Sequence, residues 1–368
     1  MRILQQCIYF PPEVGGLESH AFYLCRELVR MGHQVTMVTS LSLPGLRARD
    51  NLDGVEVVRK WFPKRRTPAG WAAHTLATVP HYLRLAKHAD VLHAQTFASA
   101  LPGMRARRKY GLPLVITLHT SHFLRLAQKP LWRPVLRRIV KSADWLLAAS
   151  EEIRDVALGL YRHPRAEALT NGVDTEMFAP VARAAARERP RVIVPRRLFE
   201  KNGVEYFIRA LPRIRQELAI DAILVGDGPE RERLERLVGE LGVGDTVSFL
   251  GRRPNREMPH LLAEADVAVF PSLMEATSVA ALEAMSCGVP VAASRVGGLP
   301  EIIDETVGTL FDPADPESLA RALIGLLRRP DLRAAGRRAR DRVVQNWSVA
   351  RLARRHEEIY ETLVRERR

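Results

Sequence analysis

Short apolar runs alternate along the chain with longer amphipathic stretches. Runs of about four to eight apolar residues are typical of strands buried on both faces, and the longer stretches have helical spacing. In the first half, the pattern predicts strands at residues 2–9, 34–40, 55–59, 90–94, 113–119 and 145–150. Alternation of strands and helices indicates an α/β protein with a doubly wound parallel sheet.

The second half repeats this pattern. It predicts strands at 191–194, 222–225, 247–250, 267–270, 291–293 and 308–311, and helices at 230–240, 258–264, 279–287, 318–327, 332–344 and 347–368. The Ala- and Arg-rich segment 179–190 separates the halves, and a length of 368 residues suits two domains. We therefore predict an N-terminal domain at 1–182, a second domain at 190–345 and a final helix at 346–368.

Two acidic residues frame the predicted helix at 279–287. Glu275 lies in the loop before it and Glu283 lies within it, and Thr277 or Ser278 can cap its first turn. Bare N–H groups at a helix N-terminus bind phosphate. A phosphate site between two hydroxyl-accepting carboxylates suits a sugar nucleotide. The alternative is that Glu283 is a polar residue on a buried helix and Glu275 a solvated loop acid.

Two further loops carry candidate binding groups. Gly15 and Gly16 follow the first strand and precede a helix, which brings backbone N–H groups together, although a plain turn has the same pattern. Arg197 and Lys201 follow the strand at 191–194. Two cations on a strand-end loop suit a diphosphate, and the alternative is solvated surface charge.

The stretch 267–303 resembles the signature of retaining GT-B glycosyltransferases of family 4. The matching residues are Glu275, Glu283, Ala284, Met285, Gly288, Pro290, Val291, Gly297, Gly298, Pro300 and Glu301. Two departures stand out. The family usually has Gly-Phe-Gly where this chain has residues 276–278, and a Lys where it has Asn202, so that Lys201 takes the place of that Lys.

The resemblance implies two Rossmann-like domains facing each other across a cleft, with the last helix crossing back to the first domain. It implies transfer of a sugar from a nucleoside diphosphate sugar to an acceptor hydroxyl, with retention and no cofactor beyond the substrate. The implied catalytic residues are Glu275, His119, Arg197 and Lys201, with a weaker expectation for His93. The implied donor-binding residues are Gly15, Gly16, Gly228, Gly251, Arg252, Thr277, Ser278, Val279 and Glu283.

Other features of the sequence indicate whether the protein needs a metal ion and in which cellular compartment it works. No Asp-x-Asp motif occurs, so we expect no metal requirement. Cys7, Cys25 and Cys287 lack metal-ligand spacing, and an odd number of cysteines suits a reducing compartment. The N-terminus is too polar for a signal sequence, and no run reaches the roughly 20 apolar residues of a membrane span. We expect a cytoplasmic protein.

The net charge of +14 lies mainly in residues 1–185, which carry +12. Nucleic acid, an anionic membrane and an acidic substrate are candidate partners. Segments 61–88 and 123–141 mix basic and aromatic residues. They predict contact with an anionic membrane surface, where the protein reaches a lipid-linked or cell-envelope glycan. The alternative is two ordinary amphipathic helices packed on the core.

Two other classes of function stay open. One is a neighbouring enzyme class, namely a GT-B sugar phosphorylase, or an epimerase or hydrolase of the sugar nucleotide, and donor turnover without any acceptor would separate these from a transferase. A basic protein that binds nucleic acid or another polymer is supported by charge alone. No nucleic-acid motif occurs and the basic charge avoids the second half, so we expect no nucleic-acid partner.

Overall fold

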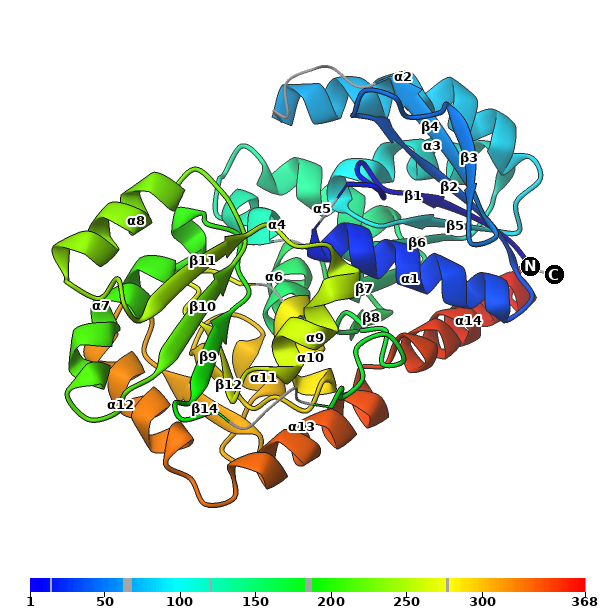
Figure 1. Ribbon diagram of the computed structural model, residues 1–368. Helices are drawn as coiled ribbons and strands as arrows, with labels where there is room; N and C mark the ends of the chain where they lie inside the picture. The colour runs from blue at the N-terminus through cyan, green and yellow to red at the C-terminus, as the bar shows by residue number, and fades with distance from the viewer. Residues whose placement is uncertain (14, 62–67, 120, 183–186, 276–277, 368) are drawn as a thin grey trace. The chain divides into compact units, whose positions relative to one another are not determined.

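The computed structural model describes residues 1–13, 15–61, 68–119, 121–182, 187–275 and 278–367. The chain forms two compact units (Figure 1). Unit 1 comprises Met1–Gly172 and Val349–Arg368, and unit 2 comprises Val173–Ser348. The sequence placed the first boundary later, at 182. Residues after 172 belong to unit 2 because Val173 N–H donates to the Trp347 carbonyl at 2.8 Å and Phe178 is fully buried in the unit 2 core.

Unit 1 contains an eight-stranded sheet in the order β3-β4-β2-β1-β5-β6-β7-β8, and only the β3–β4 pair is antiparallel. Its strands are β1 (Arg2–Gln6), β2 (Gln34–Leu41), β3 (Arg49–Leu52), β4 (Val55–Trp61), β5 (Val91–Ala94), β6 (Leu114–Leu118), β7 (Trp145–Ala148) and β8 (Ala166–Ala168). The sequence analysis missed β3 and β8. Both are short edge strands without a fully buried residue, so neither has the apolar run that marks the inner strands.

The helices of unit 1 are α1 (Gly16–Arg30), α2 (Pro68–Ala86), α3 (Ala100–Tyr110), α4 (Ser121–Ala127), α5 (Arg133–Ser142), α6 (Glu151–Leu160) and α14 (Val349–Arg365). The C-terminal helix α14 packs against α1 (Figure 1). Ile359 and Tyr360 of α14 are fully buried in the same apolar cluster as Leu24 and Leu28 of α1. The end of the chain thus completes the core of the domain that the beginning of the chain starts.

Unit 2 contains a six-stranded, wholly parallel sheet in the order β11-β10-β9-β12-β13-β14. Its strands are β9 (Arg191–Val194), β10 (Asp221–Val225), β11 (Val247–Gly251), β12 (Val267–Phe270), β13 (Val291–Ser294) and β14 (Gly308–Phe311). Numbered within the unit, this is the order 3-2-1-4-5-6 of a Rossmann sheet. The direction of winding reverses between β9 and β12, and ligands of such sheets bind beyond the carboxyl ends of the strands at that reversal.

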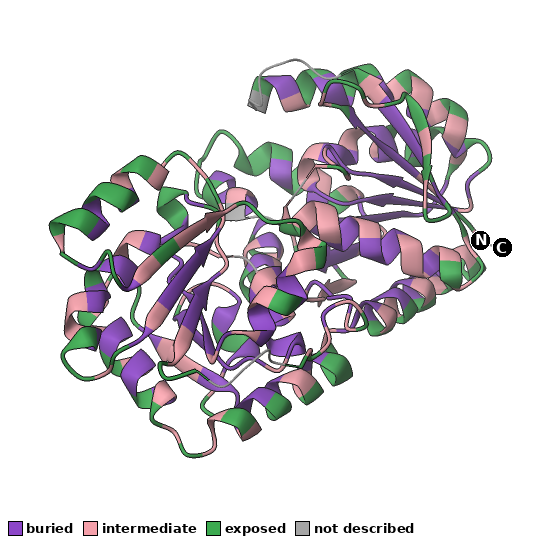
Figure 2. Ribbon diagram, viewed as in Figure 1, coloured by how far each residue is buried: buried purple, intermediate pink, exposed green. Residues whose placement is uncertain are grey.

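Helices cover both faces of the unit 2 sheet, whose strands are largely buried (Figure 2). They are α7 (Val204–Arg215), α8 (Arg231–Glu240), α9 (Met258–Ala263), α10 (Val279–Ser286), α11 (Leu299–Ile302), α12 (Pro316–Leu327) and α13 (Leu332–Asn346). Helix α10 is apolar on nearly all sides because α13 packs on its outer side. The position of α10 directly after β12 brings its N-terminus to the reversal point of the sheet.

Candidate functional site

A partly buried ion pair lies at the reversal point of the unit 2 sheet. Arg196 follows β9, and Glu275 follows the neighbouring parallel strand β12. Arg196 Nη2 donates to Glu275 Oε2 at 2.6 Å and to Ser272 Oγ at 2.7 Å. The two charged side chains are only 11% and 17% exposed. The carboxyl ends of two adjacent strands are thus joined by one guanidinium group.

Further contacts fix the same guanidinium. Arg196 Nη2 also lies 2.9 Å from Asn202 Oδ1, so its two N–H bonds are shared among three acceptors, and Asn202 Nδ2 donates to the Arg197 carbonyl at 2.6 Å. The Arg196 Cζ atom lies 5.8 Å from the centre of the Phe270 ring. Asn202 is 4% exposed and Ser272 is fully buried. Sequence reasoning missed Arg196, although its place after the first strand of the sheet pointed to it.

The N-terminus of α10 adjoins this ion pair. Ser278 caps the helix, and its Oγ accepts from Ala281 N–H at 3.3 Å. Arg196 Nη1 lies 3.5 Å from the same Oγ atom. Val279 is the first helical residue, and Thr277 lies outside the described residues. The first amides of an eight-residue helix and its dipole favour an anion beside Glu275.

Two glycines let neighbouring loops approach the site. A Cβ atom at Gly297 would collide with the Glu275 carbonyl oxygen, and the φ of Gly297 is +51°. A Cβ atom at Gly228 would collide with the Leu198 carbonyl oxygen in the loop after β9. The close approach of two backbone segments therefore explains why each position is glycine, and no contact with a ligand is needed to explain it.

The other predicted cations of unit 2 have exposed side chains. Arg197 is exposed, and its Cζ lies 5.5 Å from the centre of the Phe199 ring. Lys201 is exposed in the short 3-10 helix at 200–202. Arg252 is also exposed, just after Gly251, whose carbonyl accepts from Gly226 N–H at 2.9 Å. The buried contact with Glu275 is made by Arg196.

Glu283 lies on α10, half-buried, among apolar side chains. Burial raises the pKa of Glu283 to about 8. At neutral pH this carboxyl group therefore carries a proton and donates as well as accepts hydrogen bonds. Such a group suits contact with hydroxyls, where both directions of hydrogen bonding are useful.

In unit 1, His119 follows β6 and is 6% exposed. Its Nε2 lies 2.9 Å from Gln95 Oε1, and Gln95 Nε2 donates to Gln5 at 2.7 Å. Burial lowers the pKa of His119 to about 3, so the ring is neutral and only one of its two nitrogens carries a proton. Nδ1 lies 2.9 Å from Asn171 Oδ1. Both ring nitrogens are therefore engaged by side-chain amides.

The first residues of α1 lie close to His119 in unit 1. Gly15 caps α1 in an extended conformation, and its carbonyl accepts from Ser19 N–H at 3.0 Å, while Gly16 is the first helical residue. His20, one turn further, packs against His119 with ring centres 4.8 Å apart and ring planes at 59°. Gly15, Gly16 and His119 are thus brought together through His20, which the sequence analysis did not select.

The second predicted histidine, His93, has a structural position. It is fully buried, with Nε2 2.7 Å from Thr117 Oγ1 and Nδ1 2.6 Å from the Tyr360 hydroxyl. Both ring nitrogens are therefore used inside the core of unit 1. Neither ring nitrogen of His93 is left to bond a donor sugar.

The two segments that mix basic and aromatic residues, 61–88 and 123–141, each have some apolar side chains in the core and others on the surface. On and before α5, Leu131 is 91% exposed and Val135 48% exposed, whereas Leu136 and Val140 are fully buried. Trp132 is also exposed. In the other segment Trp61 is exposed and Tyr82 buried, and residues 64–66 lie outside the described residues. Within the described parts of the chain, we find no helix with the length and apolar character of a membrane span.

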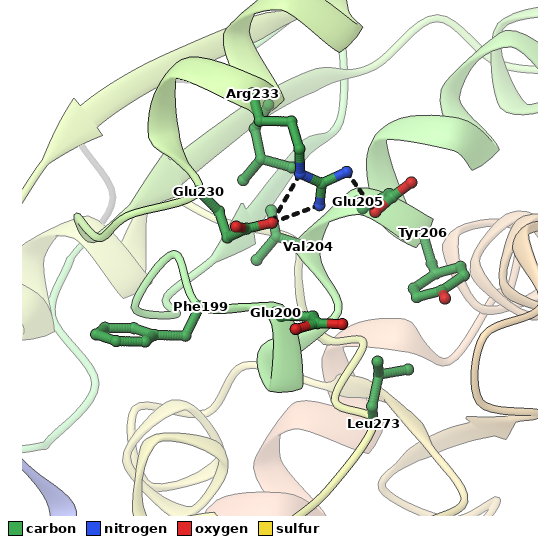
Figure 3. Close-up of a pocket in the computed structure, with 9 residues that line it drawn as sticks. Phe199, Glu200, Val204, Glu205, Tyr206, Glu230, Arg233 and Leu273 are labelled. Carbon is green, nitrogen blue, oxygen red and sulfur yellow. Dashed lines mark hydrogen bonds and ion pairs between the residues drawn. The ribbon is translucent and has the colours of Figure 1, made fainter.

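A pocket of about 290 Å³ lies in unit 2 beside the loop after β9 (Figure 3). Its lining residues are Phe199, Glu200, Val204, Glu205, Tyr206, Glu230, Arg233, Leu234 and Leu273. Arg233 pairs with Glu205 at 2.7 Å and with Glu230 at 2.5 Å. With three carboxylates and one guanidinium, this pocket repels a diphosphate. This pocket therefore does not suit a diphosphate, whereas the N-terminus of α10 does.

Comparison with known proteins identifies the family of the chain. Residues 179–342 match the family model of glycosyl transferases group 1, and residues 14–177 match that of glycosyltransferase family 4. A GDP-mannose-dependent alpha-(1-6)-phosphatidylinositol monomannoside mannosyltransferase from Mycolicibacterium smegmatis is 32% identical over 92% of each chain. A D-inositol 3-phosphate glycosyltransferase from Salinispora tropica is 30% identical over 97% of this chain and 83% of its own.

Solved structures share the fold. Sucrose-phosphate synthase from Thermosynechococcus elongatus superimposes with a TM-score of 0.86 at 24% identity, covering 98% of both chains. WaaG, a glycosyltransferase involved in lipopolysaccharide biosynthesis, gives a TM-score of 0.74 at 22% identity, covering 97% of this chain and 99% of its own.

Proposed function

The chain belongs to glycosyltransferase family 4 and has the two Rossmann-like domains of the GT-B fold, and from this premise we propose its reaction. It transfers a sugar from a nucleoside diphosphate sugar to a hydroxyl of a glycan or lipid-linked acceptor. The anomeric configuration is retained and no metal ion is needed. The observation that carries this proposal is the Arg196–Glu275 pair at the N-terminus of α10, which sets an oriented carboxylate beside an anion site.

The residues divide the work as follows. The first amides of α10, with Arg197 and Lys201, stabilise the diphosphate as negative charge builds on it. Glu275 accepts a hydrogen bond from a hydroxyl of the donor sugar, and protonated Glu283 bonds the ribose hydroxyls. His119 orients the donor sugar, and the backbone N–H groups of the Gly15–Gly16 loop bind the diphosphate. In a front-face reaction, the departing phosphate takes the proton of the acceptor hydroxyl.

A lipid-linked acceptor at the cytoplasmic face of an anionic membrane completes the proposal. Between Glu56 and Asp144 the chain has 17 Lys and Arg residues and only one acid, Asp90. The exposed Leu131, Trp132 and Val135 lie in this basic part of unit 1. The Mycolicibacterium relative acts, by its name, on a phosphatidylinositol mannoside. Basic charge beside exposed apolar side chains suits such an interface.

Donor binding and turnover test the reaction. Uridine, guanosine and adenosine diphosphates are screened for an increase in melting temperature, and the matching labelled sugar nucleotides are then supplied with and without acceptor extracts. Transfer to an acceptor, with an axial or equatorial anomeric signal matching the donor by NMR, is expected. Donor breakdown that needs no acceptor would instead identify a hydrolase or epimerase. Loss of activity with a chelator and recovery with magnesium would overturn metal independence.

Sedimentation with anionic vesicles tests the membrane contact. Wild-type protein is expected to co-pellet in low salt and to dissociate in high salt, because screening weakens charge attraction. The double variant Leu131→Ser, Trp132→Ser should bind less. Val344→Ser is the matched control, since Val344 is 41% exposed on α13 of unit 2. Equal binding of both variants, or no binding of the wild type, would refute the contact.

A further inference from the structure

We propose that Arg196 is a positioning residue that fixes the Glu275 carboxylate toward the donor sugar. This inference rests on the proposed function and assigns a role to a residue outside the family signature identified in the sequence. Its basis is the geometry of the guanidinium, whose Nη2 atom contacts Glu275, Ser272 and Asn202 at 2.6, 2.7 and 2.9 Å.

The contacts orient one particular carboxylate oxygen. Arg196 Nη2 bonds to Oε2 of Glu275, which leaves Oε1 to accept from a sugar hydroxyl. Ser272 holds the guanidinium from the loop after β12, and Asn202 holds it from the 3-10 helix at 200–202. The arginine therefore cannot follow the carboxylate if the carboxylate rotates. The Arg196 guanidinium therefore fixes the Glu275 carboxylate, and Ser272 and Asn202 in turn fix the guanidinium.

Burial indicates that Arg196 acts through Glu275 and not on the diphosphate directly. The Arg196 side chain is 11% exposed, and its Nε atom is buried with no hydrogen-bond partner among the described residues. A group enclosed in this way is poorly placed to receive a ligand oxygen. Its charge also offsets that of Glu275, which would otherwise repel a diphosphate at the neighbouring helix N-terminus.

Kinetics on the full-length protein test the inference with Arg196→Met, Arg196→Lys and the milder Ser272→Ala. For Arg196→Met, kcat should fall about 100-fold, the scale expected when a catalytic group is misplaced by about 1 Å. Affinity for the free nucleoside diphosphate, which lacks the sugar, should change less than threefold. Arg196→Lys should recover part of kcat, since charge is kept but the planar fork is lost. Ser272→Ala covers the case in which Arg196→Met does not fold, and should lower kcat without changing diphosphate affinity.

A donor lacking one sugar hydroxyl gives the decisive comparison. Among the deoxy analogues, the one that the wild type uses worst identifies the hydroxyl that Glu275 bonds. The preference for the intact donor over this analogue should be much smaller in Arg196→Met and in Glu275→Gln. The double variant should lose little more of this preference than either single variant. Diphosphate affinity that falls in parallel with kcat would overturn the inference in favour of direct phosphate binding. Unchanged kcat in an active enzyme would also overturn it. Absence of transfer by the wild type with every donor would instead refute the proposed function.

Discussion

His93 Nδ1 lies 2.6 Å from the hydroxyl of Tyr360, a residue 267 positions away in the chain. Burial keeps the pKa of Tyr360 well above its usual value and that of His93 well below, so a neutral phenol donates to a neutral ring. This bond ties the C-terminal helix α14 to strand β5 in the centre of unit 1.

Removing the hydroxyl tests how much this tie stabilises the protein. Tyr360→Phe should lower the free energy of unfolding by about 1–3 kcal/mol, because it leaves a buried acceptor without its donor. Urea denaturation measures the change. Tyr161→Phe serves as the control, since the described residues make no hydrogen bond to the half-buried Tyr161 hydroxyl. Equal stability of Tyr360→Phe and wild type would contradict the prediction.

Acid should destabilise the protein through its buried histidines. Burial lowers the pKa of His119 to about 3 and that of His356 to about 4, against 6.5 in the unfolded chain. Above pH 6.5 neither state binds a proton at these rings, so their effect is constant. Below 6.5 only the unfolded chain binds them, so stability falls, by about 1.4 kcal/mol for each ring at pH 5.5.

Urea denaturation at pH 7.5 and 5.5 measures this loss. His356→Leu removes one of these titrating rings. The difference in unfolding free energy between the two pH values should therefore be smaller in the variant. A loss on acidification as large as that of the wild type would show that His356 does not contribute.

The loop that carries Glu275 should be sensitive to a single methyl group. Gly297→Ala places a Cβ against the Glu275 carbonyl and also strains a backbone with φ of +51°. We expect activity to fall by at least about tenfold and stability to fall by about 1–3 kcal/mol. Gly159→Ala on α6 is the control, because nothing lies within 4 Å of its added Cβ. That change should be neutral or slightly stabilising.

The three thiols should be inert in the folded protein. Cys7, Cys25 and Cys287 are buried and unpaired, and burial raises the pKa of Cys287 to about 12 and those of the other two further. Because the thiolate is the reactive form, a disulfide reagent at pH 8 should titrate no thiol in native protein and three in urea. Rapid reaction of the native protein would show that part of the core opens readily.

The sequence predicted the inner strands because each is an apolar run bounded by turn residues. Strands β9, β12 and β14 have the predicted bounds. Edge strands such as β3 have no buried face, so no run of apolar residues marks them. The site is a harder case. Glu275 and Ser278 were visible in a motif, but the pairing of Glu275 with Arg196 depends on two strands distant in the chain becoming neighbours.

Charge alone did not distinguish the two adjacent arginines. Arg196 and Arg197 occupy consecutive positions, yet one is buried in an ion pair and the other is exposed over Phe199. Successive side chains after a strand leave on opposite sides of the backbone. Which side meets Glu275 depends on the packing of the sheet, and a single sequence does not contain that information.

Because unit 1 is built from both Met1–Gly172 and α14, all of unit 2 is translated before the last helix of unit 1 exists. During synthesis, Ile359 and Tyr360 leave the ribosome after every strand that they cover. The first domain to emerge is then the last to close its core, and until that moment the apolar residues that α14 covers, such as Leu24 and Leu28, lack their partners. Truncation after residue 348 would yield a chain with all of unit 2 but an incomplete unit 1.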